Sequence, residues 1–301
     1  MALPNWVTLI EMLIGCTLYC LSFYFILRIL IRLYQAVKTG NWNSSVSPTL
    51  LIYFTCWAIQ ISTGMISNVY VLAMWRPTQT EIASQMNQYL LFWTSIVTVC
   101  MSAMIPISVF FLTMERLLTI CFPMTYNNKK SRKFACFEVF TISVCFAGNF
   151  VAFCTELPLS PKTNSCITWA CLFIKTGGVT YTYTKIIAGG LNSVSGAIFV
   201  FKFWQANKNA IVSLQSNSRR VNRVALLVIF LEFFLNFVPQ LATLLLYQLF
   251  GIVVGSIIGP YNLITASLDI FISSIVYSQT GPKKALFQGS STPMPTTTVN
   301  S

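Results

Sequence analysis

The 301-residue sequence contains no histidine, and only 9% of its residues are charged. Without histidine, imidazole acid–base catalysis and histidine-ligated metal sites are excluded. Acidic residues are especially scarce: 7 Asp and Glu stand against 19 Lys and Arg, a formal net charge of +12. Soluble domains carry about 25% charged residues, so this chain could not cover itself with a water-facing surface.

Apolar residues make up 55% of the sequence and occur in long runs. Because a helix of about 20 apolar residues crosses the hydrocarbon core of a bilayer, seven such runs predict an all-α bundle of seven transmembrane helices over residues 1–280. The tail, residues 281–301, ends in Ser, Thr and Pro and is expected to be disordered there. The predicted spans are 6–30, 50–74, 89–121, 134–157, 181–204, 224–250 and 253–277.

The basic residues alternate between the two sides of the predicted bundle. All but four of the 19 Lys and Arg lie on one side, and the four exceptions are Arg76, Lys162, Lys175 and Lys185. Lys and Arg concentrate in cytoplasmic loops, so the N-terminus is expected outside and the C-terminus in the cytoplasm. The same pattern favours a multi-pass membrane protein over a partner of nucleic acid.

The inner end of the third predicted span carries an acidic–basic pair, Glu115-Arg116. An arginine so close to hydrocarbon has to reach the interface or find a partner, and we expect Glu115 to be that partner. Ile120, Pro123 and Tyr126 follow four, seven and ten residues after the arginine.

This spacing resembles the rhodopsin-like G protein-coupled receptors, whose third helix ends in the same pattern. The resemblance implies that Arg116 holds the inactive state and then meets a heterotrimeric G protein, with Glu115 as its proton-sensitive partner. In the sixth span, Phe233, Phe237 and Pro239 occupy the places of the family's Phe, Trp and Pro. Pro239 removes one backbone donor, which predicts a hinge.

The rest of the chain departs from the rhodopsin-like pattern. Only Tyr277 remains of the seventh-helix Asn-Pro-x-x-Tyr motif, the polar residues of the sodium site are missing, and Leu91 stands where the outer cysteine is expected. Such erosion around a retained third-helix motif resembles the nematode serpentine chemoreceptors, and among their smaller classes we expect class BC. A local disulfide among Cys154, Cys166 and Cys171 is open, with no pairing indicated by the sequence.

Two ionisable residues lie well inside predicted spans, Glu232 in the sixth and Asp269 in the seventh. Asn236 and Ser273 each follow one helical turn later, so the four can form one polar cluster if the two helices are neighbours. Two close carboxylates cannot both ionise cheaply, which predicts that at least one holds a proton. We hypothesise that this cluster is the moving part of the receptor. Two unrelated residues facing water are the alternative. Glu11, Glu138 and Glu156 are expected near the interface.

The resemblance places the ligand between the outer halves of the third, fifth, sixth and seventh helices. No charged residue is expected there, which favours a small neutral ligand. The candidate pocket residues are Thr98, Met101, Ser102, Ile105, Gln240, Thr243 and Tyr261.

The sequence shows no catalytic constellation, so we expect neither an enzyme nor a cofactor. The leading hypothesis is a chemosensory receptor of the plasma membrane, in the ciliary membrane of a sensory neuron, that detects a small molecule and activates a heterotrimeric G protein. A small-solute transporter and a ligand-gated channel are the alternatives. The transporter predicts an internal repeat, which is not evident, and the channel predicts the reverse orientation.

Overall fold

The computed structural model describes residues 5–38, 47–76, 86–122, 126, 128–159, 172, 176–209, 216–251 and 261–280. These residues form helices and connections, with no strand among them. The helices are α1 (Asn5–Lys38), α2 (Pro48–Ala73), α4 (Gln88–Cys121), α5 (Asn128–Cys154), α6 (Thr176–Asn209), α7 (Ser216–Leu231), the π-helical η3 (Glu232–Phe237), α8 (Val238–Phe250) and α10 (Tyr261–Thr280).

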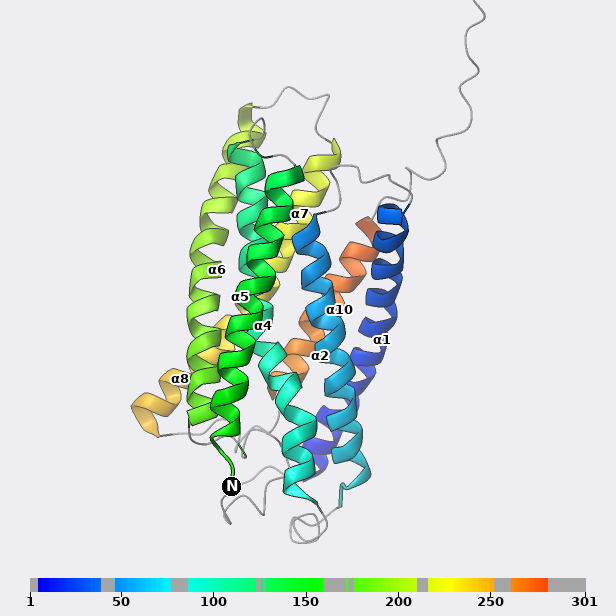
Figure 1. Ribbon diagram of the computed structural model, residues 1–301, viewed down its shortest axis with the longest axis vertical. Helices are drawn as coiled ribbons and strands as arrows, with labels where there is room; N and C mark the ends of the chain where they lie inside the picture. The colour runs from blue at the N-terminus through cyan, green and yellow to red at the C-terminus, as the bar shows by residue number, and fades with distance from the viewer. Residues whose placement is uncertain are drawn as a thin grey trace, which may run out of the picture.

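The helices run side by side as one elongated bundle (Figure 1). Within the described ranges, six helical segments are long and apolar enough to cross a membrane. The seventh predicted span corresponds to α10, which starts directly after Pro260 and whose polarity is raised by Asp269 and several serines. The first part of that predicted span, 253–260, lies outside the described residues.

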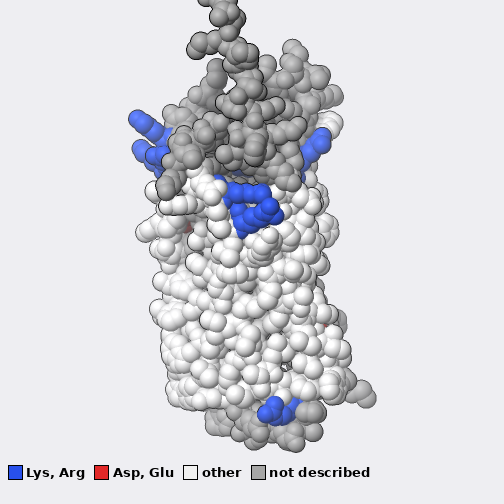
Figure 2. Space-filling model, turned by 90° about the vertical axis from the view of Figure 1, so that its right-hand side faces the viewer, with Lys and Arg blue, Asp and Glu red and all other residues white. Residues whose placement is uncertain are grey.

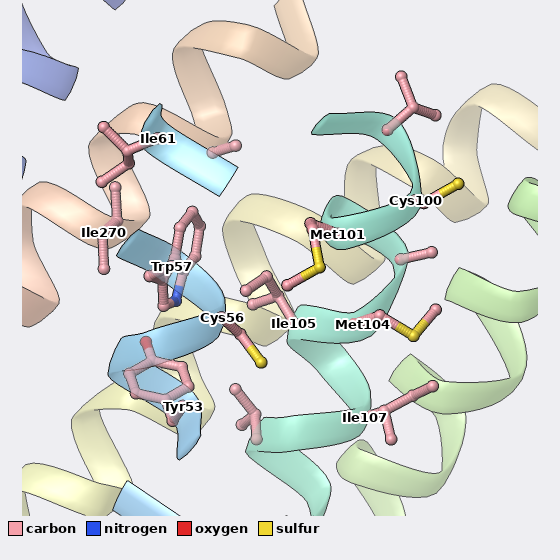
Figure 3. Packing of buried hydrophobic residues seen from close by; sticks show 14 of the residues in the cluster. Tyr53, Cys56, Trp57, Ile61, Cys100, Met101, Met104, Ile105, Ile107 and Ile270 are labelled. Atoms are coloured by element: carbon pink, nitrogen blue, oxygen red, sulfur yellow. The ribbon is translucent and has the colours of Figure 1, made fainter. Parts of the chain in front are cut away.

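α4 is the central helix of the bundle. In its most apolar window 78% of the residues are buried, against 28% in α1 and 22% in α5. α4 packs mainly against α2 and α6, while α1 packs against α10. Figure 3 shows the resulting core, where Trp57 and Cys56 of α2 face Met101 and Ile105 of α4. Because α4 packs against both α2 and α6, a movement of either helix changes the contacts of side chains on α4.

The sixth span is one continuous helix with a π-helical turn in its middle. In η3 the ladder of hydrogen bonds widens, and the backbone N–H of Val238 donates to the carbonyl of Phe233. This turn ends two residues before Pro239, which has no N–H and whose ring crowds the preceding turn. The irregular turn therefore lies where the proline predicted a hinge. Gly251 closes α8 with φ of 65°, a left-handed conformation that glycine adopts freely.

The surface of the bundle separates charge from apolar side chains. Figure 2 shows a broad, almost uncharged band with most of the visible Lys and Arg at one end and a small group at the other. Many large apolar side chains are exposed on the surface of the bundle, among them Tyr24, Ile66, Phe140 and Phe201. In water such a surface would aggregate, whereas lipid accommodates it without cost.

Candidate functional site

The carboxylate of Glu115 is the centre of a hydroxyl cluster near the C-terminal end of α4. It accepts hydrogen bonds from Ser47, from Thr49 at 2.5 Å, from Ser131 at 2.6 Å and from Tyr126 at 3.5 Å. Ser47 and Thr49 belong to the start of α2, and Ser131 to the first turn of α5. We call these five residues the Glu115 cluster. It ties three helices together at one carboxylate.

Tyr126 lies in the connection between α4 and α5 and contributes the weakest of these bonds. Burial, followed by the nearby charge of Glu115, raises the pKa of Tyr126 to about 12. Its hydroxyl is therefore protonated throughout the physiological range and can donate to Glu115. The four hydroxyl donors together satisfy the charge of a carboxylate that is only 3% exposed.

Arg116 is not engaged by Glu115 in the way the sequence suggested. The Glu115 oxygens are directed at hydroxyl groups, and within the described part of the chain no salt bridge joins the two side chains. Arg116 is 8% exposed, and its Nε has no hydrogen-bond partner. Its charge acts on the partly buried Tyr277 of α10. The expected pair is thus wrong, because three other elements bring hydroxyls closer to the carboxylate.

Ile120 of the third-helix motif packs against the core, while Pro123 lies outside the described residues. Tyr277, the residue that remains of the seventh-helix motif, stacks edge-on against Phe54 of α2 with ring centroids 5.0 Å apart. This end of the bundle is closed in the structure, since both Arg116 and Glu115 are buried.

Glu232, Asn236, Asp269 and Ser273 meet between η3 and α10; we call them the carboxyl cluster. The amide nitrogen of Asn236 donates to Glu232 at 3.0 Å and to Asp269 at 2.7 Å. Ser273 donates to the other oxygen of Asp269 at 3.4 Å. The two acidic residues are 2% and 1% exposed, so the cluster is shielded from solvent. The structure brings together all four residues that the spacing had paired.

The same Asn236 amide donates to both carboxyl groups, so the two acids lie side by side. Two adjacent carboxylates repel each other in a buried site, and a shared proton between them stays a prediction. Lys185 on α6 lies close enough for its charge to act on Glu232, which connects the cluster to a third helix.

Phe237 lies at the end of η3 and fills a notch in α6. A Cβ atom added to Gly189 would lie 2.5 Å from Cδ2 of Phe237, so the ring reaches the helix backbone only because residue 189 is glycine. Phe233 packs against Phe237 with ring centroids 5.7 Å apart. The two phenylalanines thus connect the π-helical turn to α6.

Lys185 overturns the expectation that no charged residue lies in the outer half of the bundle. It is 7% exposed and donates to Tyr181 at 3.3 Å and to Ser102 at 3.5 Å. Its Nζ also lies 5.4 Å from the centre of the Tyr181 ring. Lys185 lies inside both the predicted span 181–204 and α6, which begins at Thr176, and its side chain points into the bundle.

The expected pocket residues do not form one site. Thr98 and Ser102 line a cavity of about 40 Å³ bounded by α1, α2, α4, α6 and α10. Met101 and Ile105 are core residues packed towards α2 (Figure 3). On α8, Gln240 is buried and Thr243 donates to Pro239 within its own helix. The side chain of Tyr261 is outside the described part of the structure.

Two glutamates expected near the interface are buried. Glu138 on α5 is 0% exposed, accepts a hydrogen bond from Ser108 of α4 at 3.2 Å and leaves Oε2 without a partner. Glu156 accepts from the backbone N–H of Gly177 at 2.8 Å and so caps the start of α6. The burial of Glu138 could not be predicted from the sequence around it, because its partner Ser108 lies on another helix.

No group of His, Cys, Asp and Glu in the described ranges could hold a metal ion. Cys154 is a free thiol, while Cys166 and Cys171 lie outside the described residues.

Comparison with known proteins identifies the family. No curated protein matches the chain. The family model described as "Serpentine type 7TM GPCR chemoreceptor Srbc" matches residues 4–284, which is almost the whole chain. Because this match covers most of the chain, the protein belongs to the Srbc family of nematode serpentine chemoreceptors.

Proposed function

We propose that this protein is a plasma-membrane chemoreceptor that binds a small molecule from outside and activates a heterotrimeric G protein inside. Membership of the Srbc family supports the chemosensory role. The observation that carries the coupling proposal is the closed inner end, where Arg116 is buried beside Tyr277 and the Glu115 cluster fastens α4 to α2 and α5. A buried cation at a helix end is costly, which favours a state in which it meets a partner.

The moving element in this proposal is the inner half of the sixth span. α7 packs against both α4 and α10, and the π-helical turn separates it from α8. Bending at η3 would carry α7 away from α4 and expose Arg116 to the cytoplasm. A G protein that binds only the open state would then stabilise it, as any ligand with differential affinity does.

The carboxyl cluster is the proposed internal switch. It joins η3 to α10 directly and reaches α6 through Lys185. Because Glu232 and Asn236 belong to the π-helical turn, bending there would change their distances to Asp269. In this proposal Glu232 and Asp269 share one proton, so the carboxyl cluster carries a single negative charge. The positive charge of Lys185 balances it, and we therefore still propose a neutral ligand despite the buried lysine.

The orientation is part of the same proposal. The excess of Lys and Arg at one end of the bundle supports a cytoplasmic position for that end, and α1 begins at the opposite end (Figures 1 and 2). The sensory cilium is the proposed location, since a chemoreceptor has to face the outside.

A cell-based assay tests this function. Cells expressing the receptor with an epitope tag at each end are exposed to a panel of small volatile molecules, and G protein activation is recorded. We expect a response in wild type that Arg116→Ala abolishes, with Arg28→Ala, an exposed arginine on α1, as the matched control. An N-terminal tag accessible only after permeabilisation, or a response that survives Arg116→Ala, would rule the proposal out.

A further inference from the structure

The cavity beside Thr98 and Ser102 contains two polar atoms with unmet hydrogen-bonding capacity. Gln60 and Asn68 of α2 both line it, and they are 2% and 7% exposed. The Oε1 of Gln60 lacks a donor, and the Nδ2 of Asn68 lacks an acceptor. Buried polar groups in native proteins are nearly always hydrogen-bonded, so these two atoms indicate a place for a missing partner.

The cavity exists because residue 64 is glycine. Gly64 lies on α2 one turn from both Gln60 and Asn68. A Cβ atom there would come within 3.2 Å of Cγ2 of Thr98 and 3.3 Å of Cε2 of Tyr19, both of which also line the cavity. A methyl group at position 64 would therefore fill space between the two amides without touching either.

Hydroxyl groups complete the wall of the cavity. Thr98 donates to Thr63 at 3.0 Å, and Ser102 and Tyr181 share a hydrogen bond of 3.3 Å. None of the described lining residues is Asp, Glu, Lys or Arg. These residues offer neutral donors and acceptors, and the charged Lys185 lies behind Ser102 and Tyr181.

We propose that this cavity is the binding site for a small neutral molecule carrying hydroxyl groups, such as a short-chain alcohol or diol. A hydroxyl group can donate a hydrogen bond to Oε1 of Gln60 and accept one from Nδ2 of Asn68. The cavity of about 40 Å³ holds a few water-sized groups, which limits the ligand to a handful of non-hydrogen atoms. Such small ligands bind with dissociation constants of about micromolar at best.

The site also has a route to the switch. A ligand hydroxyl that bonds to Ser102 or Tyr181 competes with the hydrogen bonds that hold Lys185. Lys185 in turn interacts with Glu232 in the π-helical turn. This inference deepens the proposed function, because it names the ligand class and the place where binding begins.

Binding is tested without a G protein. The full-length receptor is purified in lipid nanodiscs, and thermal unfolding is followed with millimolar n-butanol, propylene glycol, diethyl ether, n-pentane or propionate, which all have the same number of non-hydrogen atoms. We expect the two hydroxyl compounds to raise the melting temperature in a saturable way, the ether to act weakly, and pentane and propionate to have no saturable effect. Stabilisation by bound ligand follows its concentration over the dissociation constant.

Three variants locate the effect. In Gly64→Ala and in Asn68→Leu, at least ten times more ligand should be needed for the same rise in melting temperature. Gly148→Ala, where a Cβ meets nothing within 4 Å, should respond like wild type. Asn68→Leu keeps the test decisive if Gly64→Ala does not unfold cooperatively. Equal effects of pentane and butanol, a preference for propionate, no saturable effect of either hydroxyl compound, or an unchanged response in both cavity variants would overturn the inference. Butanol binding without G protein activation would instead leave the site standing and refute the proposed coupling.

Discussion

The contact between Gly189 and Phe237 allows the proposed switch to be perturbed by a single methyl group. In Gly189→Ala the new Cβ would lie 2.5 Å from Cδ2 and 3.2 Å from Cγ of the Phe237 ring. Overpacking of this kind costs about 1–3 kcal/mol. That free energy falls on the closed arrangement seen in this structure, in which Phe237 occupies the notch in α6.

A free-energy difference of about 1–3 kcal/mol changes a two-state equilibrium about 5–150-fold. If Phe237 leaves the notch when the sixth span bends, the open state escapes the clash and its population rises. We therefore expect Gly189→Ala to raise basal G protein activation severalfold. The assay is nucleotide exchange on a purified G protein, stimulated by receptor in nanodiscs and normalised to the folded receptor.

The neighbouring glycine supplies the control. A Cβ at Gly190 meets nothing within 4 Å, and both positions lie in the interior of α6. Gly190→Ala thus gains the same helix propensity, about 1 kcal/mol, without the clash. Replacing Phe237 by Leu in the Gly189→Ala background should bring the basal activity back towards that of Phe237→Leu alone. Equal basal activity of the two glycine variants would refute the reasoning.

Three further predictions concern the polar clusters. Ser131→Ala removes the 2.6 Å bond to Glu115 and should lower stability by about 1.5–3 kcal/mol, measured by thermal unfolding against the exposed Ser143→Ala. Asn236→Leu removes both amide donors from the carboxyl cluster and should lower the melting temperature more than Phe234→Leu, an exposed neighbour in the same turn; an equal or smaller loss would contradict the role of Asn236. Glu138→Gln keeps an acceptor for Ser108 and removes any buried charge, so we expect unchanged or higher stability, and a marked loss would show that the carboxylate is required.

Much of the fold follows from local sequence properties. The apolar runs and the alternation of basic residues predicted the helices, because a bilayer demands length and charge asymmetry. The carboxyl cluster could also be predicted from the sequence. Glu232 and Asn236 are four residues apart on one helix, and Asp269 and Ser273 are four residues apart on the helix beside it. Pro239 similarly indicated the place of the irregular turn, although not its π-helical geometry.

Long-range contacts were beyond the sequence. Ser47 and Ser131 reach Glu115 from 68 and 16 residues away along the chain, and nothing in their local surroundings indicates it. The burial of Lys185 depends on the face of α6 that meets α4, where Ser102 accepts from it across 83 residues of sequence. Nothing in the sequence of α2 distinguishes Gln60, Gly64 and Asn68 as a site. The site becomes recognisable only from the structure, which places Thr98 and Tyr19 opposite Gly64.

The most direct test of the account concerns Arg116 alone. Wild type, Arg116→Ala and Arg28→Ala are reconstituted in nanodiscs with a purified heterotrimeric G protein, and receptor-stimulated nucleotide exchange is measured at equal amounts of folded receptor. The account predicts that exchange falls to the receptor-free rate only in Arg116→Ala. Exchange by Arg116→Ala at the wild-type rate would contradict it.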